Sequence, residues 1–258
     1  MSTTLGAADK RRSWALGALG LALLVALWWL GVELLGRALP MARQLAPLPT
    51  FGTLGRLLAE APIWAHIGLS MQRVAVGLAG ALAIGVPLGL WIGAVRGAEQ
   101  LSSGAFQFLR MISPLSWMPI VVMLLGIGNA PIYFLLIFAA VWPIIMNTAA
   151  GVRAINPQWL QLGQSLSATR WELLSRIVLP AVLGHILTGL RLAIGIVWIV
   201  LVPCEMLGVS AGLGYFILDT RDRLAYSELM AAILLIGLLG FALDAASRWA
   251  HRRWTHQP

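Results

Sequence analysis

Long apolar runs that are nearly free of charged side chains recur along this chain. An α-helix needs about 20 residues to cross the hydrocarbon core of a bilayer, and a helix satisfies its own backbone hydrogen bonds there. The chain is 59% hydrophobic and 11% charged, with a mean hydropathy of +0.84. The sequence therefore predicts an all-α, polytopic membrane protein with about six transmembrane helices. The predicted spans are Trp14–Leu35, Met71–Val95, Pro114–Ile127, Ile132–Ala150, Ala181–Leu207 and Leu229–Trp249.

Basic residues gather beside these runs, above all at residues 10–12 and 248–253. Basic segments are retained preferentially on the cytoplasmic side of a membrane, so both termini are predicted to be cytoplasmic. We expect cytoplasmic tails at 1–12 and 251–258 and a single transmembrane domain at 13–250. This arrangement explains the net charge of +8 better than nucleic-acid binding does, and we predict no nucleic-acid partner.

Local composition refines this topology. The second run is rich in Gly and Ala, which would let a neighbouring helix approach closely. Pro119 predicts a bend within the short third run. Residues 37–66 read as an extracytoplasmic connection with a short amphipathic piece, TFGTLGRLLAEA. The Gly-rich stretch GVSAGLGYF reads as a second outer loop, followed by the charged DTRDR.

A polar stretch at residues 156–180, NPQWLQLGQSLSATRWELLSRIVLP, lies between two apolar runs. Asn156 is suited to cap a helix, and Pro157 suits the first helical position. The apolar residues recur at spacings that predict two short amphipathic helices, with a bend at Ser165, Ser167 and Thr169, where helix propensity is weak. Such a segment lies on a membrane surface or docks onto a partner rather than crossing lipid.

This stretch resembles the cytoplasmic coupling segment of permeases in binding-protein-dependent ATP-binding cassette (ABC) importers. The family motif reads Glu-Ala-Ala, three residues, Gly, nine residues and Ile-x-Leu-Pro. Ile177 and the Leu-Pro pair that ends at Pro180 match it. The triplet beginning at Gln161 stands where Glu-Ala-Ala would be, and Ser167 stands in place of the Gly.

The resemblance spans roughly residues 48–250 and points to one branch of the family. SLSATRWELLSRIVLP and TGLRLAIGIVWIVLVPCEMLG look like the nitrate, sulfonate, taurine and bicarbonate permeases, as do FLRMISPLSWMPI, WPIIMNTAAGV and GLGYFILDTRDRL. It implies a type I ABC importer permease in a bacterial inner membrane, working as a dimer, most simply a homodimer. The implied partners are an ATP-binding subunit, a periplasmic solute-binding protein and membrane lipid. The implied solute is a small anion such as nitrate, a sulfonate, taurine or bicarbonate.

The chain itself carries no recognisable catalytic or metal chemistry. A phosphate-binding loop needs a lysine after a Gly-rich turn, and Lys10, the sole lysine, has none. Cys204 is the sole cysteine and the four histidines lack ligand spacing, so no metal site is expected. We therefore predict a non-enzyme without cofactors, whose separate partner ATPase binds ATP and Mg²⁺. Its candidate contacts to that ATPase are Gln161, Gly163, Ser167, Ala168, Thr169, Arg170 and Glu172.

Glu205 is the most conspicuous ionisable residue within a predicted span, and such residues face a cavity, a partner or the protein interior. Arg191 lies fourteen residues earlier, about 21 Å along a helix, so the two cannot pair within it. A pathway role and a structural role both stay open for Glu205. If it coupled ion movement to transport, the chain would be an ion-coupled secondary transporter, the alternative function. Further candidates to line a passage are Trp117, Trp142, Asn147 and Trp198.

Overall fold

The computed structural model describes residues 7–95 and 97–255, and all regular elements in these ranges are helices. Among the described residues five helices are long and apolar enough to cross a membrane, or six if one bent pair counts as a span. The predicted all-α membrane fold is confirmed. Residues 1–6 and 256–258, which belong to the predicted tails, lie outside the described residues. The five spans are Ala15–Ala38, Ala61–Ala94, Asn129–Arg153, Arg170–Gly208 and Tyr226–Trp249.

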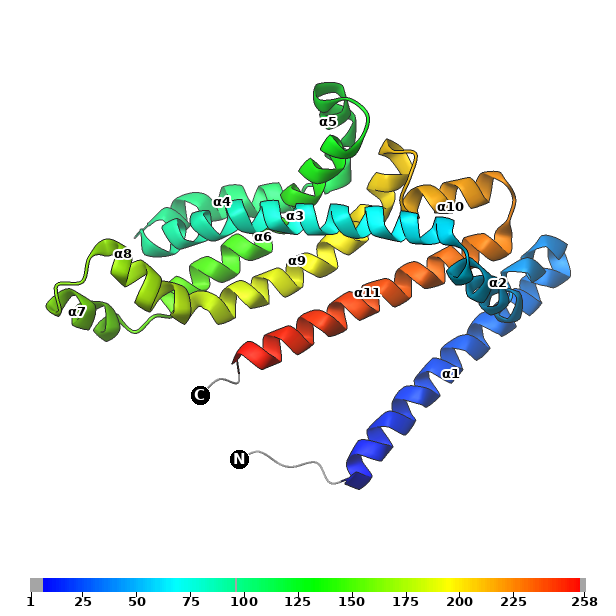
Figure 1. Ribbon diagram of the computed structural model, residues 1–258, viewed down its shortest axis with the longest axis horizontal. Coiled ribbons are helices and arrows are strands. Elements are labelled where there is room, and N and C mark those ends of the chain that lie inside the picture. The colour runs from blue at the N-terminus through cyan, green and yellow to red at the C-terminus, as the bar shows by residue number, and fades with distance from the viewer. Residues whose placement is uncertain (1–6, 96, 256–258) are drawn as a thin grey trace. The chain divides into compact units, whose positions relative to one another are not determined.

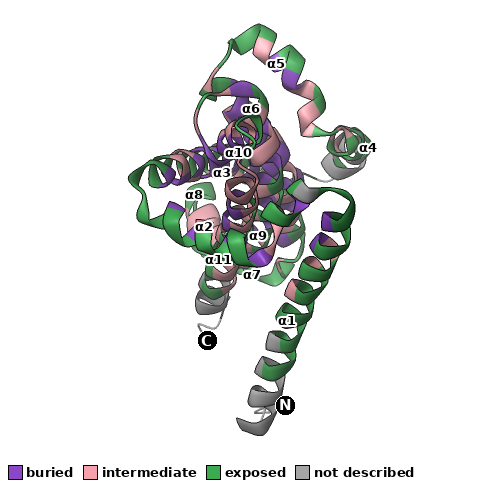
Figure 2. Cartoon of the chain, turned by 90° about the vertical axis from the view of Figure 1, so that its right-hand side faces the viewer, coloured by how far each residue is buried: buried purple, intermediate pink, exposed green. Residues whose placement is uncertain are grey.

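The chain divides into two compact units, which are described separately. The first comprises residues 1–63 and 219–235. It contains α1 (Ala7–Ala38), the 3-10 helix η1 (Pro40–Leu45), α2 (Pro47–Ala59) and the start of α11 (Tyr226–Thr255). The Trp28 indole N–H donates to the Leu45 carbonyl at 3.0 Å and ties α1 to the segment after it. Most of the described side chains of α1 are exposed, as Figure 2 shows along that helix.

The second unit comprises residues 64–218 and 236–258. Its core is formed by α3 (Ala61–Ala94), α6 (Asn129–Arg153) and α9 (Leu179–Gly208). Helices α6 and α9 pack extensively along each other, and they lie side by side in Figure 1. Buried residues are concentrated on α6, where an apolar face of Ile, Leu and Ala is closed from solvent.

A stripe of small residues lets α3 lie close against α6. Gly85, Gly89 and Gly93 recur every four residues, on one face of the helix. A Cβ atom added to Gly89 would lie 2.6 Å from the Thr148 Cβ and 2.8 Å from the Ile145 carbonyl oxygen. The prediction that small residues of the second span admit a neighbour is therefore confirmed, since no larger side chain fits at this distance.

The third membrane segment is bent before the predicted position. Helix α4 (Ala98–Met111) is followed by the 3-10 helix η2 (Pro114–Trp117) and by α5 (Met118–Leu125). The bend of 81° lies between Met111 and Pro114. Pro119 sits instead in the first turn of α5, where a residue without an N–H leaves no hydrogen bond unmade.

The remaining elements of the second unit lie at the two ends of α9. Helices α7 (Pro157–Ser165) and α8 (Arg170–Leu173) precede it, and one turn of π-helix, η3 (Leu174–Val178), joins α8 to α9. Figure 1 shows α7 and α8 together at one end. At the other end, GVSAGLGYF was predicted to be an outer loop, but the observed loop is shorter because α10 (Leu213–Asp222) begins inside this stretch.

Candidate functional site

The polar segment 156–180 forms the first short helix, α7, as its pattern predicts. The second, α8, has only four residues and continues through η3 into α9, so no new helix begins at Pro180. The Asn156 side chain accepts the Gln158 N–H at 3.0 Å, and Pro157 occupies the first turn of α7. The chain turns between α7 and α8, and Ser167 at the turn has a φ of 57°. Its neighbour Ala168 donates its N–H to the Gly163 carbonyl at 3.0 Å, which closes the end of α7. The cap and the bend are thus confirmed.

A capping box that sequence reasoning missed begins α8. The Thr169 hydroxyl accepts the Glu172 N–H at 3.3 Å, and the Glu172 carboxylate accepts the Thr169 N–H at 2.9 Å. The pattern Thr-x-x-Glu was visible in the sequence as a helix start signal. This exchange satisfies two backbone donors that the first turn of a helix otherwise leaves open.

Gly163 brings α7 and α8 into contact. A Cβ atom there would lie 2.5 Å from a Leu173 methyl carbon and 2.9 Å from the Ile177 Cδ1. Gly163 is buried, so its place is inside the helical pair rather than on its surface. Because η3 continues into α9 without a break, a displacement of this pair moves the start of a membrane-spanning helix.

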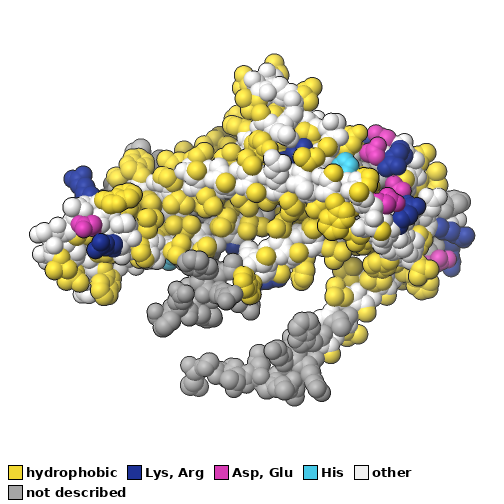
Figure 3. Space-filling model, viewed as in Figure 1, with side chains coloured by type: hydrophobic (Ala, Val, Ile, Leu, Met, Phe, Trp, Pro, Cys, Tyr) yellow, Lys and Arg dark blue, Asp and Glu magenta, His cyan; other side chains and the backbone are white. Residues whose placement is uncertain are grey.

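The surface of this helical pair is both polar and apolar. Figure 3 shows acidic and basic side chains at the end where Figure 1 places α7 and α8. Trp159, Leu166 and Trp171 are 59%, 74% and 71% exposed beside them. Exposed aromatic side chains next to charged ones are typical of protein contact surfaces. Of the predicted contacts, the exposed ones are Gln161, Ser167, Thr169 and Arg170, and the half-buried ones are Ala168 and Glu172.

The opposite end of α9 carries a buried polar cluster. The Arg73 guanidinium on α3 donates to the Glu205 carboxylate on α9 at 2.6 Å, and the two side chains are 4% and 0% exposed. The Ser70 hydroxyl also bonds this carboxylate, at 2.8 Å to Oε1. Sequence reasoning singled out Glu205 but missed Arg73 and Ser70. The sequence did contain a signal for this pair: an arginine and a glutamate lie on different predicted spans, and buried charges within a membrane are usually paired.

This cluster also caps α10. Three consecutive backbone N–H groups each donate to a side chain: Gly212 to His66 at 3.0 Å, Leu213 to Ser70 at 2.9 Å and Gly214 to Glu205 at 2.9 Å. A carboxylate at a helix N-terminus is further favoured by the helix dipole. The contacts of Glu205 therefore favour a structural role over a role in the solute pathway.

Gly212 makes this close approach possible. Its φ is 128°, a region that residues with a side chain rarely adopt, and an added Cβ would lie 2.5 Å from the Arg73 Nη1 and 2.6 Å from the Glu205 carboxyl carbon. Glycine is thus required at this position for both conformation and space.

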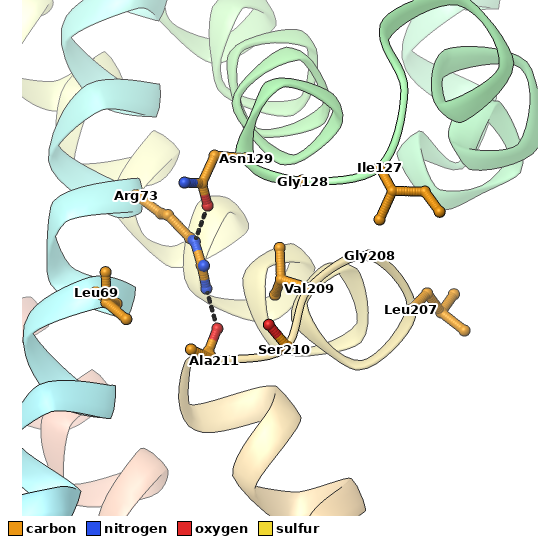
Figure 4. Close-up of a pocket in the computed structure, with 10 residues that line it drawn as sticks. All are labelled: Leu69, Arg73, Ile127, Gly128, Asn129, Leu207, Gly208, Val209, Ser210 and Ala211. Atoms are coloured by element: carbon orange, nitrogen blue, oxygen red, sulfur yellow. Dashed lines mark hydrogen bonds between the residues drawn. The ribbon is translucent and has the colours of Figure 1, made fainter.

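A hollow of about 640 Å³ opens beside the cluster, between α3, the start of α6 and the loop after α9. Figure 4 shows Arg73 at its wall, donating to Asn129 at 2.9 Å and to the Ala211 carbonyl at 2.7 Å. The positive charge of Arg73 is already compensated by Glu205, so this hollow offers no uncompensated charge from the pair.

The other candidate passage residues lie at different places on η2, α6 and α9. Trp142 borders a second pocket, and Trp117 packs against Phe138, which lines the same pocket, with ring centroids 5.8 Å apart. The Asn147 amide donates to the Pro143 carbonyl one turn earlier, at 2.8 Å. Trp198 faces α11, because a Cβ on Gly240 would lie 2.5 Å from its indole nitrogen. The structure thus places Trp117 and Trp142 near one pocket, with Asn147 and Trp198 elsewhere.

A family model described as "Binding-protein-dependent transport system inner membrane component" matches residues 85–256. A bicarbonate transport system permease protein of Synechococcus elongatus is 37% identical over 185 residues, 71% of this chain and 66% of that protein. A nitrate import permease protein of Leptolyngbya laminosa is 37% identical over 180 residues, 70% of this chain and 64% of that protein. These two matches therefore span just under two thirds of the relatives' length.

A taurine transport system permease protein of Escherichia coli is 30% identical over 246 residues, 91% of this chain and 86% of that protein. Among solved structures, a chain of a bacterial alginate ABC transporter in complex with its periplasmic protein superposes with a TM-score of 0.66 at 18% identity. The match covers 96% of this chain and 97% of that one. A chain of the inward-facing MetNI methionine ABC transporter has a TM-score of 0.58 at 15% identity, over 76% and 99% of the two chains. These likenesses confirm the predicted permease fold.

Proposed function

The chain belongs to the family of binding-protein-dependent transport system inner membrane components, and we propose that it is the transmembrane permease subunit of an ATP-driven ABC importer. The observation that carries this proposal is the helical pair α7–α8, which follows the membrane-spanning helix α6 and continues into α9. Its surface carries exposed tryptophans beside charged side chains, which suits contact with a protein partner better than complete burial in lipid.

The partner that fits this surface is a separate ATPase subunit, which binds ATP and Mg²⁺. Its movement on nucleotide binding would displace α7–α8 as one body, because Gly163 packs the two helices together. The displacement reaches α9, which extends about 45 Å from Leu179 to Gly208. At the far end of α9 Glu205 holds the start of α10, so the same helix links the partner surface to the loop beside the hollow.

The solute class that the relatives support is a small anion. Relatives at 30–37% identity are named for bicarbonate, nitrate and taurine transport. We infer further that the permease pairs with a second copy and receives its solute from a periplasmic solute-binding protein. Both termini would then lie in the cytoplasm and α7–α8 on the same side, in a bacterial inner membrane.

Co-purification tests this proposal. The tagged chain is expressed with the ATPase and binding-protein genes beside its own, and ATP-dependent uptake is measured in proteoliposomes. We expect the ATPase to co-elute, and to be lost when residues 161–172 are scrambled while the chain still inserts. A chain that elutes alone and moves solute on an ion gradient would make it a secondary transporter and overturn the proposal.

A further inference from the structure

A second pocket of the larger unit, of about 330 Å³, lies between the end of α4, η2, α6 and α9. We call it the aromatic pocket. Its walls are mostly apolar, and Arg110 is the only charged residue among those that line it. The lining residues that matter here are Arg110, Phe138, Trp142, Leu192, Ile196 and Val200.

The ring side chains around the aromatic pocket form one connected cluster. The Phe138 and Trp142 rings meet edge to face, with centroids 5.6 Å apart and planes at 87°. Trp117 packs on Phe138 at 5.8 Å, and Phe106 packs on Trp142 at 5.5 Å. A planar aromatic ring inserted here meets ring faces and edges, which aromatic pairs favour beyond simple area burial. The indole N–H groups of Trp117 and Trp142 are buried without an acceptor in the described structure.

Arg110 differs from the paired arginines of the same unit. Arg73 is paired with Glu205, and Arg191 lies 3.7 Å from Asp244. Arg110 donates to the Met146 sulfur at 3.5 Å, and within the described residues it contacts no carboxylate. Arg110 lies in the last turn of α4 and is exposed, so its guanidinium is open to a bound anion at the mouth of the pocket. Its remaining N–H donors suit the oxygens of a carboxylate or sulfonate.

The size and the apolar walls of the pocket favour a larger anion with an apolar body over a small inorganic anion. Nitrate and bicarbonate have four heavy atoms each, whereas the pocket holds about ten times the volume of one water molecule in the liquid. Apolar walls cannot replace the hydration of so small an anion. They do favour an apolar body attached to the acid group. The unpaired Arg110 and the ring cluster together fit a molecule with an acid at one end and a ring at the other.

We propose that the solute carried by this permease is an aromatic acid, an arene sulfonate or carboxylate, whose ring occupies the aromatic pocket and whose acid group binds Arg110. This inference rests on the proposed function, since it takes the chain to carry an anion. It narrows the solute class from small anions in general to anions with a ring.

Binding of defined probes to the full chain in lipid nanodiscs tests this inference by calorimetric titration. The probes are benzenesulfonate, benzoate, methanesulfonate and nitrate. We expect benzenesulfonate or benzoate to bind about tenfold or more tightly than methanesulfonate or nitrate. Arg110→Gln should weaken the ring-bearing probe about tenfold to hundredfold, the range for a hydrogen bond to a charged group. Ile196→Trp should abolish its binding by filling the pocket.

Arg37→Gln is the matched control, because Arg37 on α1 is exposed like Arg110 but does not line the aromatic pocket. Each variant is first checked for a single symmetrical elution peak, so that misfolding is separated from lost binding. Equal or tighter binding of methanesulfonate or nitrate, no binding of the ring-bearing probes at millimolar concentration, or unchanged binding in Ile196→Trp would each overturn the inference. Those results leave co-elution of the ATPase untouched, whereas loss of co-elution in the wild-type chain refutes the proposed function itself.

Discussion

Arg73 on α3 and Glu205 on α9 form an ion pair at 2.6 Å across 132 residues of sequence, and both side chains are closed from solvent. The pair is surrounded by further hydrogen bonds, since Ser70 donates to the same carboxylate and Gly214 donates its N–H to it. Two spanning helices and the first turn of α10 therefore meet at one carboxylate. The cluster therefore ties α3, α9 and α10 together at that end of the unit.

Replacing Glu205 by Gln should destabilise the protein strongly. Breaking a buried ion pair leaves an uncompensated charge, which costs about 3–5 kcal/mol. The variant should show a lower midpoint of thermal unfolding in detergent and a lower yield of folded protein. Uptake per folded molecule, by contrast, should fall little if the role of Glu205 is structural.

Arg191→Gln is the control for this experiment, because the Arg191–Asp244 pair is exposed and its charges are 3.7 Å apart. Exposed pairs contribute about 0–1 kcal/mol, so this variant should unfold near the wild-type temperature. A Glu205→Gln protein that keeps wild-type stability but no longer transports would instead assign Glu205 to the solute pathway.

Gly89→Ala should disturb the packing of α3 on α6. The added methyl group would lie 2.8 Å from the Ile145 backbone oxygen, which cannot rotate away as a side chain does. Overpacking of this kind costs about 1–3 kcal/mol. Gly68→Ala on the same helix is the control, since a Cβ there meets no heavy atom within 4 Å. Thermal unfolding of the two variants should separate them, and equal midpoints would contradict the close packing at Gly89.

Thr169→Ala should loosen the start of α8 without affecting membrane insertion. The change removes the hydroxyl that accepts the Glu172 N–H, and loss of a Thr cap costs about 1 kcal/mol. We expect weaker co-purification of the ATPase and reduced ATP-dependent uptake. Thr169→Ser keeps the hydroxyl and should restore both. If Ser behaves like Ala, the cap is not what orders this surface.

Ala168→Glu should uncouple ATP hydrolysis from uptake. Ala168 is half-buried at the turn between α7 and α8, so a larger charged side chain would stand between the segment and its partner. The assay compares ATPase activity and uptake in the same proteoliposomes. Gln158→Glu introduces the same charge at an exposed position early in α7 and should leave coupling intact. Normal uptake in Ala168→Glu would remove Ala168 from the proposed contact surface.

Local signals in the sequence were sufficient for α7 and α8. Asn156 and Pro157 mark the start of α7, and the cluster at Ser165–Thr169 marks its end. These signals act within four residues of the backbone groups that they satisfy, so they can be read without knowing the fold. The Thr169–Glu172 capping box has the same local character and was equally readable.

Helix α10 could not be found in this way. Its first N–H groups are satisfied by Ser70 and Glu205, which approach from α3 and α9. Without those acceptors the stretch has the composition of a loop, with three glycines in nine residues of GVSAGLGYF. The bend of the third membrane segment was predicted at Pro119 but lies before Pro114. Pro119 does not bend the helix, because it occupies the first turn of α5, where its missing N–H breaks no hydrogen bond.

Local patterns in the sequence were sufficient to predict an all-α membrane protein, most of its spanning helices and the polar segment that interrupts them. The length of an apolar run, the positions of charges and the helix caps each depend on residues close together in the sequence, so they can be recognised without the fold. Three features could be seen only in the folded chain: Glu205 pairs with Arg73, Gly89 lies against α6, and Arg110 borders a ring-lined pocket. Each of these depends on side chains from segments far apart in the chain, and their proximity is set by the packing of helices rather than by any local pattern.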